Sequence, residues 1–170
     1  MRDKPIMAID PGQHESGCVV LVDGIVEYSG LEQNEVLCHT IDDFLRTYPT
    51  GDVVIEHIRC YGMPVGAEIF DTVEWCGEFR RICKDSICTA RFISRKQVVV
   101  ELCGSQKAKD SNVRQAVIDA FPATGGGKVP QIGTKSAPGP LYGISGHLWQ
   151  ALGLALAFIR LAELEAVSEG

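Results

Sequence analysis

The sequence predicts a mixed fold of the α/β or α+β class, and three observations support this prediction. Short apolar runs bounded by turn residues occupy the first part of the chain, which is typical of β-strands. Longer segments with apolar residues at helical spacing follow them. Strands come first and helices then alternate with single strands, an order that favours a sheet covered by helices. The length of 170 residues fits a single domain spanning positions 1–170.

The N-terminal segment is predicted to form a β-meander of three strands. The first strand, Pro5 to Asp10, is apolar and ends in an acidic residue followed by Pro-Gly. The second strand covers Gly17 to Val22, and the third covers Ile25 to Ser29. Between these two, Asp23-Gly24 is a strong signal for a two-residue hairpin turn.

Two helices and a fourth strand are predicted in the middle of the chain. The first helix covers Ile41 to Tyr48, with Thr40 as its N-cap. The fourth strand covers Asp52 to Ile58, and a loop from Cys60 to Gly66 leads to the second helix, Ala67 to Lys84. Apolar residues at helical spacing are expected to form the buried face of this second helix. They are Ile69, Val73, Cys76, Phe79, Ile82 and Cys83.

The C-terminal half is predicted to add one strand, Thr89 to Ile93, and three helices. The first of these helices covers Ser94 to Leu102 and is capped by its own first residue. The next covers Asp110 to Phe121, with Asp110 or Ser111 as its cap, and the strongly apolar last helix covers Ser145 to Val167. Four apolar residues are expected on one face of the middle helix. They are Val113, Ala116, Val117 and Ala120.

A connection rich in glycine and proline, residues 122–142, separates the last two predicted helices. Loops of this length in a compact domain are usually functional or disordered, so we predict a mobile loop here. Its Gly125 to Lys128 run does not fit a phosphate-binding loop, because the required spacing to a Lys-Ser/Thr pair and the strand-to-helix context are both missing. We therefore expect no nucleotide cofactor.

Charge is distributed unevenly along the chain. The net charge is -6, but residues 80–135 contain 11 Lys and Arg against 4 Asp and Glu. Such segregation fits a protein that presents one basic face to a polyanion. A solvated basic helix and loop would fit the charge pattern equally well.

We expect a cytoplasmic protein, in a bacterium or a phage-infected host cell. No secretory signal is visible, and the most apolar stretch, Leu148 to Leu164, is interrupted by polar residues and short for a bilayer. The seven cysteines include no Cys-x-x-Cys pair. Reduced thiols are therefore expected in place of disulfides or a zinc site.

Two acidic residues occupy positions where charge is unexpected. Asp10 directly follows a buried strand, and Glu56 lies inside an apolar one. A buried carboxylate must be paired, hydrogen-bonded or metal-bound, and hard divalent cations prefer such oxygen ligands. Both acids would form a metal site if their strands are neighbours; otherwise Asp10 shapes the turn and Glu56 is paired.

A histidine and an amide in the last predicted helix complete the candidate set. His147 follows Gly143, Ser145 and Gly146, so we place it in the first turn of the helix, facing an opening. Gln150 comes three residues later and shares its face. A histidine in this position is also compatible with a plain core or surface role.

Four blocks of this chain resemble the RuvC-type Holliday-junction resolvases, and especially their phage- and prophage-encoded branch. The family's first strand pair is similar to AIDPGQHESGCVVL, and its second acidic strand, loop and helix to VVIEHIRCYGMPVGAEIFDTVEWCGEF. Its basic helix-loop-helix segment is similar to SRKQVVVELCGSQKAKDSNVRQAVIDAF, and its closing helix to GPLYGISGHLWQALGLALA. The blocks keep their order from about Ile6 to Phe158.

The resemblance implies an RNase H-like fold, a mixed five-stranded sheet with helices on both sides, and a homodimer. It implies symmetric nicking of four-way DNA junctions with two Mg²⁺ ions, for which Mn²⁺ is a possible substitute. Asp10 and Glu56 match the first two acidic ligands, and His147 matches the third position, where the family has Asp or His. Gln150 stands at the fourth catalytic position, usually Asp. Either fewer carboxylates suffice, or another acid such as Asp110 helps, or the enzyme is inactive.

Basic and apolar residues are expected to contact the DNA. Lys107, Lys109 and Arg114 would neutralise phosphates near the scissile bond, and a second group of basic residues would extend that surface. That second group is Arg80, Arg81 and Lys84. Tyr61 and Met63, in the loop after Glu56, would wedge against bases at the junction centre or pack on a dimer partner.

Three rival functions remain open from the sequence. One is a related nuclease that cuts flaps or other branched DNA, and a second is a junction-binding protein without activity. The third, a lobe of a sugar-kinase or actin-like ATPase, is disfavoured because the chain is too short for the two lobes that bind ATP there.

Overall fold

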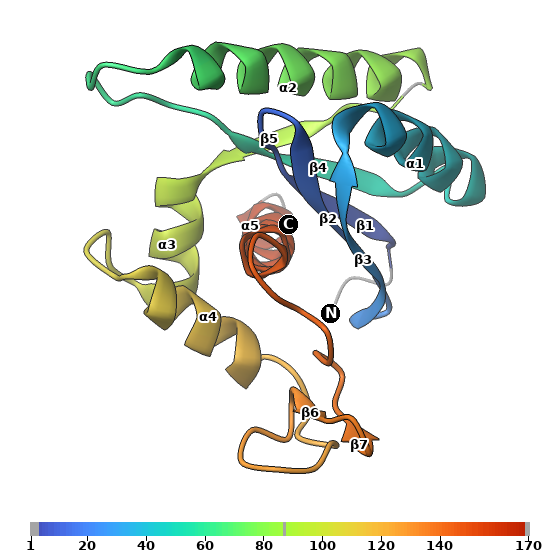
Figure 1. The fold of residues 1–170 in the computed structure, drawn as a ribbon, viewed down its shortest axis with the longest axis vertical. Helices are drawn as coiled ribbons and strands as arrows, with labels where there is room; N and C mark the ends of the chain where they lie inside the picture. The colour runs from blue at the N-terminus through green and yellow to red at the C-terminus, as the bar shows by residue number, and fades with distance from the viewer. Residues whose placement is uncertain (1–3, 87, 169–170) are drawn as a thin grey trace.

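The computed structural model describes residues 4–86 and 88–168 and contains the mixed five-stranded sheet that the resemblance implies (Figure 1). The strand order is β3-β2-β1-β4-β5. Strands β1, β2 and β3 pair antiparallel, whereas β4 pairs parallel with both β1 and β5. The strands are β1 (Ile6–Asp10), β2 (Glu15–Val22), β3 (Ile25–Gln33), β4 (Asp52–His57) and β5 (Arg91–Ser94).

The predicted β-meander is confirmed. Asp23 and Gly24 both have positive φ, 51° and 76°, as a two-residue hairpin turn of this type requires. Strand β3 runs to Gln33, four residues beyond its predicted end, and pairs with the whole of β2. Its extension was missed because β3 is an edge strand with mostly exposed side chains, so it lacks a continuous apolar run.

Helix α1 (Asn34–Thr47) begins seven residues earlier than predicted. The predicted cap Thr40 therefore lies inside the helix, where its hydroxyl donates to the Glu32 carboxylate at 2.7 Å. The first turn carries polar residues because Asn34 is completely buried and hydrogen-bonded to the turn after β1. The prediction also missed Leu37, which is four residues before Ile41 and is buried on the same face of the helix.

Helix α2 (Ala67–Asp85) has the predicted bounds to within one residue, but part of its predicted buried face is wrong. Thr72, Cys76, Phe79 and Cys83 form the buried face. Val73 is 47% exposed, because it lies beside this face on the solvent side.

Helices α3 (Arg95–Cys103), α4 (Asp110–Asp119) and α5 (Leu148–Ser168) follow the predicted order. Ser94 caps α3 as predicted, in a reciprocal capping box with Gln97. The N-cap of α4 is Lys109, not Asp110 or Ser111. Val113 and Val117 are buried as predicted, whereas Ala120 is exposed and Ile118 takes part in the core.

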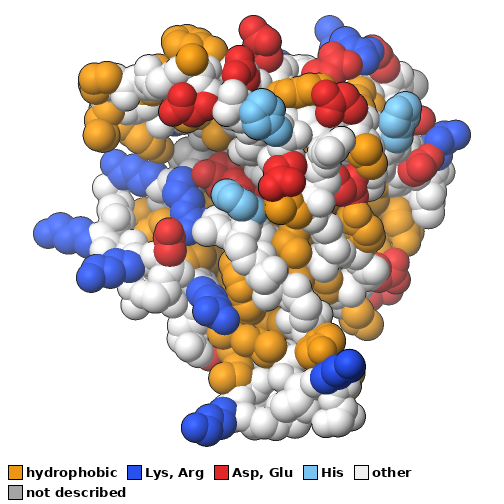
Figure 2. All heavy atoms as spheres, in the orientation of Figure 1, with side chains coloured by type: hydrophobic (Ala, Val, Ile, Leu, Met, Phe, Trp, Pro, Cys, Tyr) orange, Lys and Arg blue, Asp and Glu red, His pale blue; other side chains and the backbone are white. Residues whose placement is uncertain are grey.

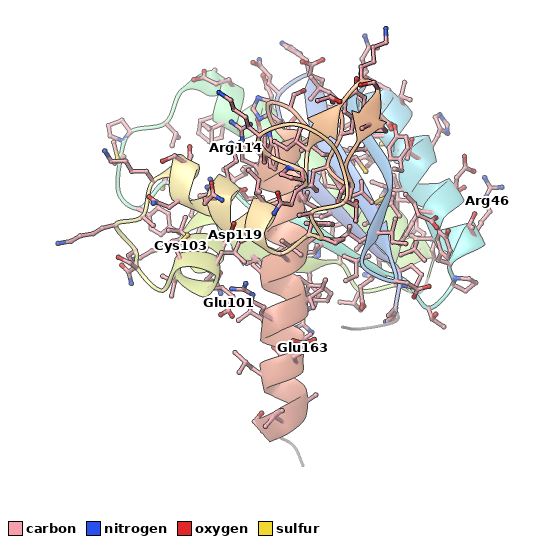
Figure 3. The ribbon with its side chains drawn as sticks, turned by 90° about the horizontal axis from the view of Figure 1, so that it is seen from below. Arg46, Glu101, Cys103, Arg114, Asp119 and Glu163 are labelled. Atoms are coloured by element: carbon pink, nitrogen blue, oxygen red, sulfur yellow. The ribbon has the colours of Figure 1, made fainter. Side chains whose placement is uncertain are left out.

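The sheet separates two apolar clusters. Side chains alternate along each strand, so Ile6 and Ala8 point to the cluster with α3, α4 and α5, while Met7 and Ile9 point to the cluster with α1 and α2. Helix α5 contacts β1, β2 and β4, and its last turns extend beyond the rest of the molecule, past Glu163 (Figure 3). The helices on both faces agree with the predicted arrangement.

Residues 122–142 form a lobe at one end of the molecule (Figure 1). The lobe contains a two-stranded ladder, β6 (Gly133–Thr134) with β7 (Ala137–Pro138), and several backbone hydrogen bonds close it. At Gly125, Gly133 and Gly139 an added Cβ would lie within 2.6 Å of neighbouring backbone atoms. These glycines therefore allow the backbone to pack on itself, so the predicted loop has a defined path; its mobility stays a prediction.

All seven cysteines have free thiols in this structure, and Cys18, Cys76 and Cys83 are buried. Across the two described stretches of chain, no helix has the length and apolar character needed to span a membrane.

Replacing Ser94 with alanine is expected to lower the free energy of unfolding by about 1 kcal/mol, because the cap hydroxyl of α3 is lost. Ser94 is buried, and its hydroxyl is within 2.8 Å of Gln97 Oε1. Urea unfolding of the variant and the wild type measures this difference. Equal stabilities would show that the capping box contributes nothing to holding α3 against the sheet.

Candidate active site

The two candidate carboxylates lie at the carboxyl ends of neighbouring parallel strands. In the β1–β4 pair, Ile9 is the register partner of Ile55, so Asp10 and Glu56 come next on their strands. Ala8 and Val54 both point toward α5. Asp10 and Glu56 come two positions later on the same strands, so the alternation of side chains directs both acids to that side of the sheet. The structure therefore brings these two predicted ligands together.

His147 joins Asp10 directly. Its Nδ1 lies 2.9 Å from Asp10 Oδ2. The Asp10 side chain is only 12% exposed, whereas the His147 side chain is 69% exposed. The ring therefore covers a nearly buried carboxylate and remains open to solvent, in agreement with the expected opening.

His147 also starts α5, although it lies just before the helix and not in its first turn as predicted. Its carbonyl oxygen accepts hydrogen bonds from the backbone N–H groups of Gln150 and Ala151, both at 3.1 Å. The positive end of the α5 dipole consequently lies beside Asp10, where it favours negative charge.

Gly17 makes the approach of His147 possible. It is the register partner of Asp10 in the β1–β2 pair, on the same side of the sheet. A Cβ at this position would lie 3.1 to 3.2 Å from the carbonyl group and Cβ of His147. The sequence signal for this contact is the Ser16-Gly17 pair that follows the Asp-Pro-Gly turn.

A buried hydrogen-bond network holds the turn after Asp10, and sequence analysis missed it. The Gly12 N–H donates to Ser16 Oγ at 3.1 Å, and Ser16 Oγ donates to Asn34 Oδ1 at 2.6 Å. Asn34 Nδ2 then donates to the Gly12 carbonyl at 3.0 Å. The network ties the end of β1 to α1 and so fixes the backbone that carries Asp10.

Burial and mutual repulsion change the acidity of both carboxyl groups. Burial raises the pKa of Glu56 to about 7, and the negative charge of Asp10 adds to this increase. Burial also raises the pKa of Asp10, while the hydrogen bond from His147 opposes the increase. The positive charge of Arg95 lowers the pKa of both groups.

The oxygen atoms around these acids fit a hard divalent cation. Among the described residues, Glu56 Oε2 and Gln150 Oε1 are buried and have no hydrogen-bond partner. Residues 4–86 and 88–168 contain no group of three or more His, Cys, Asp or Glu close enough to form a complete metal cage. Mg²⁺ does not need one, because it is commonly held by one or two carboxylates and keeps several waters. Asp10, Glu56 and His147, with the amide oxygen of Gln150, are the residues that would hold it.

Three of the predicted DNA-contacting residues lie together near this edge of the molecule. Lys107 is in the α3–α4 connection, Lys109 caps α4, and Arg114 is on α4 with its guanidinium 4.7 Å from the Trp149 ring. Lys and Arg side chains gather over α3 and α4 and on the lobe, while Asp and Glu predominate over the sheet and α1 (Figure 2). The lobe contributes Lys128 and Lys135.

The other three predicted basic residues lie on α2, on the opposite face of the sheet from α4. Arg81 forms ion pairs with Glu78 and Asp85 on its own helix. Arg80 lies over the Phe92 ring, 5.9 Å from its centroid, and it lines a groove beside α2 together with Lys84. The structure does not bring this group together with Lys107, Lys109 and Arg114.

The loop after Glu56 carries exposed apolar side chains. Tyr61 is 58% exposed and Met63 is 72% exposed, and hydrophobic side chains cover this corner of the molecule (Figure 2). Tyr61 has a φ of 47°, and the Lys96 ammonium lies 5.9 Å from the centroid of its ring. The loop therefore extends from the acidic site toward the start of α3.

Arg95 is a site residue that sequence analysis did not select. It is the first residue of α3 and forms an ion pair with Asp110, the acid considered above as an additional ligand. Its signal in the sequence was weak, because a charged residue after a helix cap is common on protein surfaces.

The chain matches none of the protein-family models and none of the curated proteins with which it was compared. Its structure is similar to that of Thermus thermophilus RuvC, with a TM-score of 0.70 and 17% identity over 95% of this chain and 96% of that one. It is also similar to T. thermophilus RuvC in complex with a Holliday junction substrate, with a TM-score of 0.71, 18% identity and the same coverage. The chain therefore has the RNase H-like fold of these structures, as the sequence resemblance implied.

Replacing Glu56 with glutamine is expected to raise the unfolding midpoint in EDTA at pH 8 by roughly 2 to 6 °C. The pKa of Glu56 is raised from 4.5 to about 7 in the folded protein. The folded state therefore binds the proton more tightly than the unfolded state, and stability falls as the pH rises through this window. Glutamine imitates the protonated acid, so the variant should not lose this stability as the pH rises. Thermal unfolding of the variant and the wild type at pH 4.5 and pH 8 measures the effect. An equal difference in unfolding midpoint at both pH values would contradict the raised pKa of Glu56.

Proposed function

We propose that this protein is a metal-dependent endonuclease that nicks four-way DNA junctions symmetrically. The observation that carries the proposal is the position of Asp10 and Glu56 on the paired strands β1 and β4, with His147 Nδ1 2.9 Å from Asp10 Oδ2. We propose that Gln150, in the first turn of α5, completes this set. The similar RuvC structure with a Holliday junction substrate supports branched DNA as the ligand. The segregation of Lys and Arg over α3, α4 and the lobe supports a nucleic-acid surface beside the acids.

The proposed mechanism is in-line attack of water on a phosphodiester. Asp10 and Glu56 would hold the divalent ions, which are two Mg²⁺ or Mn²⁺ ions in the scheme that the resemblance implies. When bound, these ions would supply positive charge that activates the water and offsets charge on the leaving 3′ oxygen. His147 orients Asp10 through its Nδ1 and exposes the rest of its ring, which suits a metal ligand or a proton carrier.

The DNA is proposed to lie across the α3–α4 side of the molecule. Lys107, Lys109 and Arg114 would contact phosphates, which fixes the position of the duplex without reading its sequence. Tyr61 and Met63 would meet the bases at the branch point, where stacking on exposed side chains is available.

A related nuclease and an inactive binding protein, the two main rival functions, make different predictions. A nuclease for flaps would cut flaps in preference to four-way junctions, and an inactive junction-binding protein would bind junctions with Mg²⁺ or Mn²⁺ and never cut. The neutral amide of Gln150, in a position where an acid would bring charge, is the observation that favours the inactive alternative.

Asp10→Asn and Glu56→Gln are expected to abolish cutting of a synthetic four-way junction in Mg²⁺, because each removes a charged ligand. The measurement is the rate of nicking on labelled junctions, flaps and plain duplex. Arg46→Gln, on the exposed end of α1 away from the site, is the matched control and should cut like the wild type.

Retained cutting by Asp10→Asn or Glu56→Gln would contradict the assigned roles. Gln150→Asp tests the amide in the same assay. Faster cutting by this variant would identify position 150 as a ligand site that has lost its charge, and slower cutting would show that the amide suits the site as it stands.

We further propose that two copies associate through α2, which places two active sites on one junction. The solvent side of α2 exposes Phe70 and Val73, at 62% and 47%, and a Cβ at Gly77 would meet no atom within 4 Å. A groove of about 620 Å³ runs beside this surface. The first half of α2 contains three acidic residues and no basic one, whereas its three basic residues all lie in the second half. An antiparallel pair of α2 helices would therefore bring Arg80 and Lys84, which are not paired with Glu78 or Asp85 as Arg81 is, near the acids of the partner.

Val73→Glu is expected to convert the dimer to a monomer, because it places a charge in the proposed contact between α2 helices. The molar mass from size-exclusion chromatography with light scattering should fall to that of one chain, 18.5 kDa. Val167→Glu is the control, since Val167 is 81% exposed at the far end of α5. An unchanged mass for Val73→Glu would place the dimer contact elsewhere.

A further inference from the structure

The site contains a cation that the proposed scheme leaves without a role. Arg95 begins α3 directly after β5, and its neighbour Ser94 is the register partner of His57 in β4. His57 is the residue that follows Glu56 on β4. The guanidinium is therefore carried to the edge of the sheet where Asp10 and Glu56 end, and it interacts favourably with both.

The surroundings of Arg95 differ from those of the other basic residues on this side. Lys107, Lys109 and Arg114 are exposed, whereas the Arg95 side chain is only 27% exposed. Arg95 Nη1 is buried and has no hydrogen-bond partner among the described residues. Burying a charged N–H group without a hydrogen-bond acceptor is unfavourable. A ligand that supplies an acceptor to Arg95 Nη1 would therefore be bound favourably.

The partner that Arg95 does have is easily displaced. Arg95 Nη2 donates to Asp110 Oδ1, and the Asp110 side chain is 76% exposed. Ion pairs with an exposed partner contribute little to stability, because water and salt screen them. An incoming anion with two oxygens in one plane would satisfy both nitrogens of the guanidinium, which one Asp110 oxygen does not.

A fixed cation in this place would serve the proposed reaction. Asp10 and Glu56 repel a phosphodiester wherever bound metal ions do not offset their charge, and the neutral amide of Gln150 does not change that balance. A fixed positive charge beside Glu56 would draw the phosphate toward the acids and orient it. Arginine is suited to this task because its planar fork matches two non-bridging phosphate oxygens.

We propose that Arg95 binds the scissile phosphate of the DNA, and that Asp110 holds the guanidinium in position until the phosphate replaces it. This inference rests on the proposed function. It adds a phosphate-binding residue to the acidic site. It also assigns Asp110 the role of a competitor of the DNA phosphate, and not the role of an additional metal ligand.

The test is binding of a fluorescent four-way junction, measured by anisotropy with Ca²⁺ in place of Mg²⁺ to prevent cutting. Arg95→Gln should weaken binding about tenfold, as expected when a charged hydrogen-bond partner is lost, and Arg95→Lys should weaken it less. The slope of log affinity against log salt should decrease by about 1 in Arg95→Gln.

A junction with a neutral methylphosphonate at single positions around the branch point identifies the phosphate. In the wild type, one position should reproduce the loss caused by Arg95→Gln. In Arg95→Gln, that same substitution should cause no further loss, while other phosphates keep their effects. The inference would be overturned if the loss of affinity from every methylphosphonate added to the loss from Arg95→Gln. It would also be overturned if Arg95→Gln bound the junction like the wild type.

Asp110 has a matched control on its own helix. Asp119 is an exposed acid on α4, and its carboxylate is bonded to Gln115, not to Arg95 (Figure 3). Both Asp110→Asn and Asp119→Asn remove one negative charge from the DNA-facing side. Asp110→Asn should tighten binding by about two- to fivefold beyond Asp119→Asn, and this excess should disappear in an Arg95→Gln background. Equal effects of the two variants would overturn the role of Asp110.

These outcomes separate the inference from the proposed function. A wild-type protein that does not prefer the junction to plain duplex would overturn both. A wild-type protein that prefers and cuts junctions, with Arg95→Gln binding unchanged, would overturn only the role of Arg95. If Arg95→Gln fails to fold, as its unfolding midpoint would show, the Asp110→Asn and Asp119→Asn pair alone decides the question.

Discussion

The parallel pairing of β1 with β4 is the constraint on which the site depends. It sets two buried strands side by side in one register, so that the residues after Ile9 and Ile55 meet at one edge. Both strands are covered on both faces, so both acids lie at the end of a buried strand. Burial raises the pKa values of both carboxyl groups, and the charge of Asp10 adds to the increase at Glu56. The fold thus places at this edge two carboxylates whose negative charge a bound cation would relieve.

The rest of the molecule supports this edge in layers. The Gly12, Ser16 and Asn34 hydrogen bonds fix the chain just after Asp10, and α1 anchors them in the core beneath. On the other side of the sheet, α5 approaches closely because Gly17 has no side chain. Positive charge is then distributed outward from Arg95 to the exposed lysines of the α3–α4 connection. The net charge of the whole chain, which is negative, conceals this local arrangement.

The sequence predicted most of the strands and the two acids, because a buried strand that ends in a carboxylate is visible as a local pattern. It did not predict where α1 begins, since the polar start of that helix is explained only by the distant Gly12 turn. It assigned Val73 to the core because helical spacing does not distinguish the centre of a face from its margin. Arg95 was missed because its position beside the acids follows from the pairing of β5 with β4, two strands that are far apart in the sequence.

His147 links the register of a helix to the chemistry of the site, since its carbonyl starts α5 and its ring meets Asp10. Insertions or deletions in the glycine-rich lobe must be absorbed before this residue, where the chain is already turning. Changes of the same size one turn later would rotate the whole apolar helix against the sheet. A change in length before His147 therefore leaves the contact between α5 and the sheet in place, whereas a change after it does not.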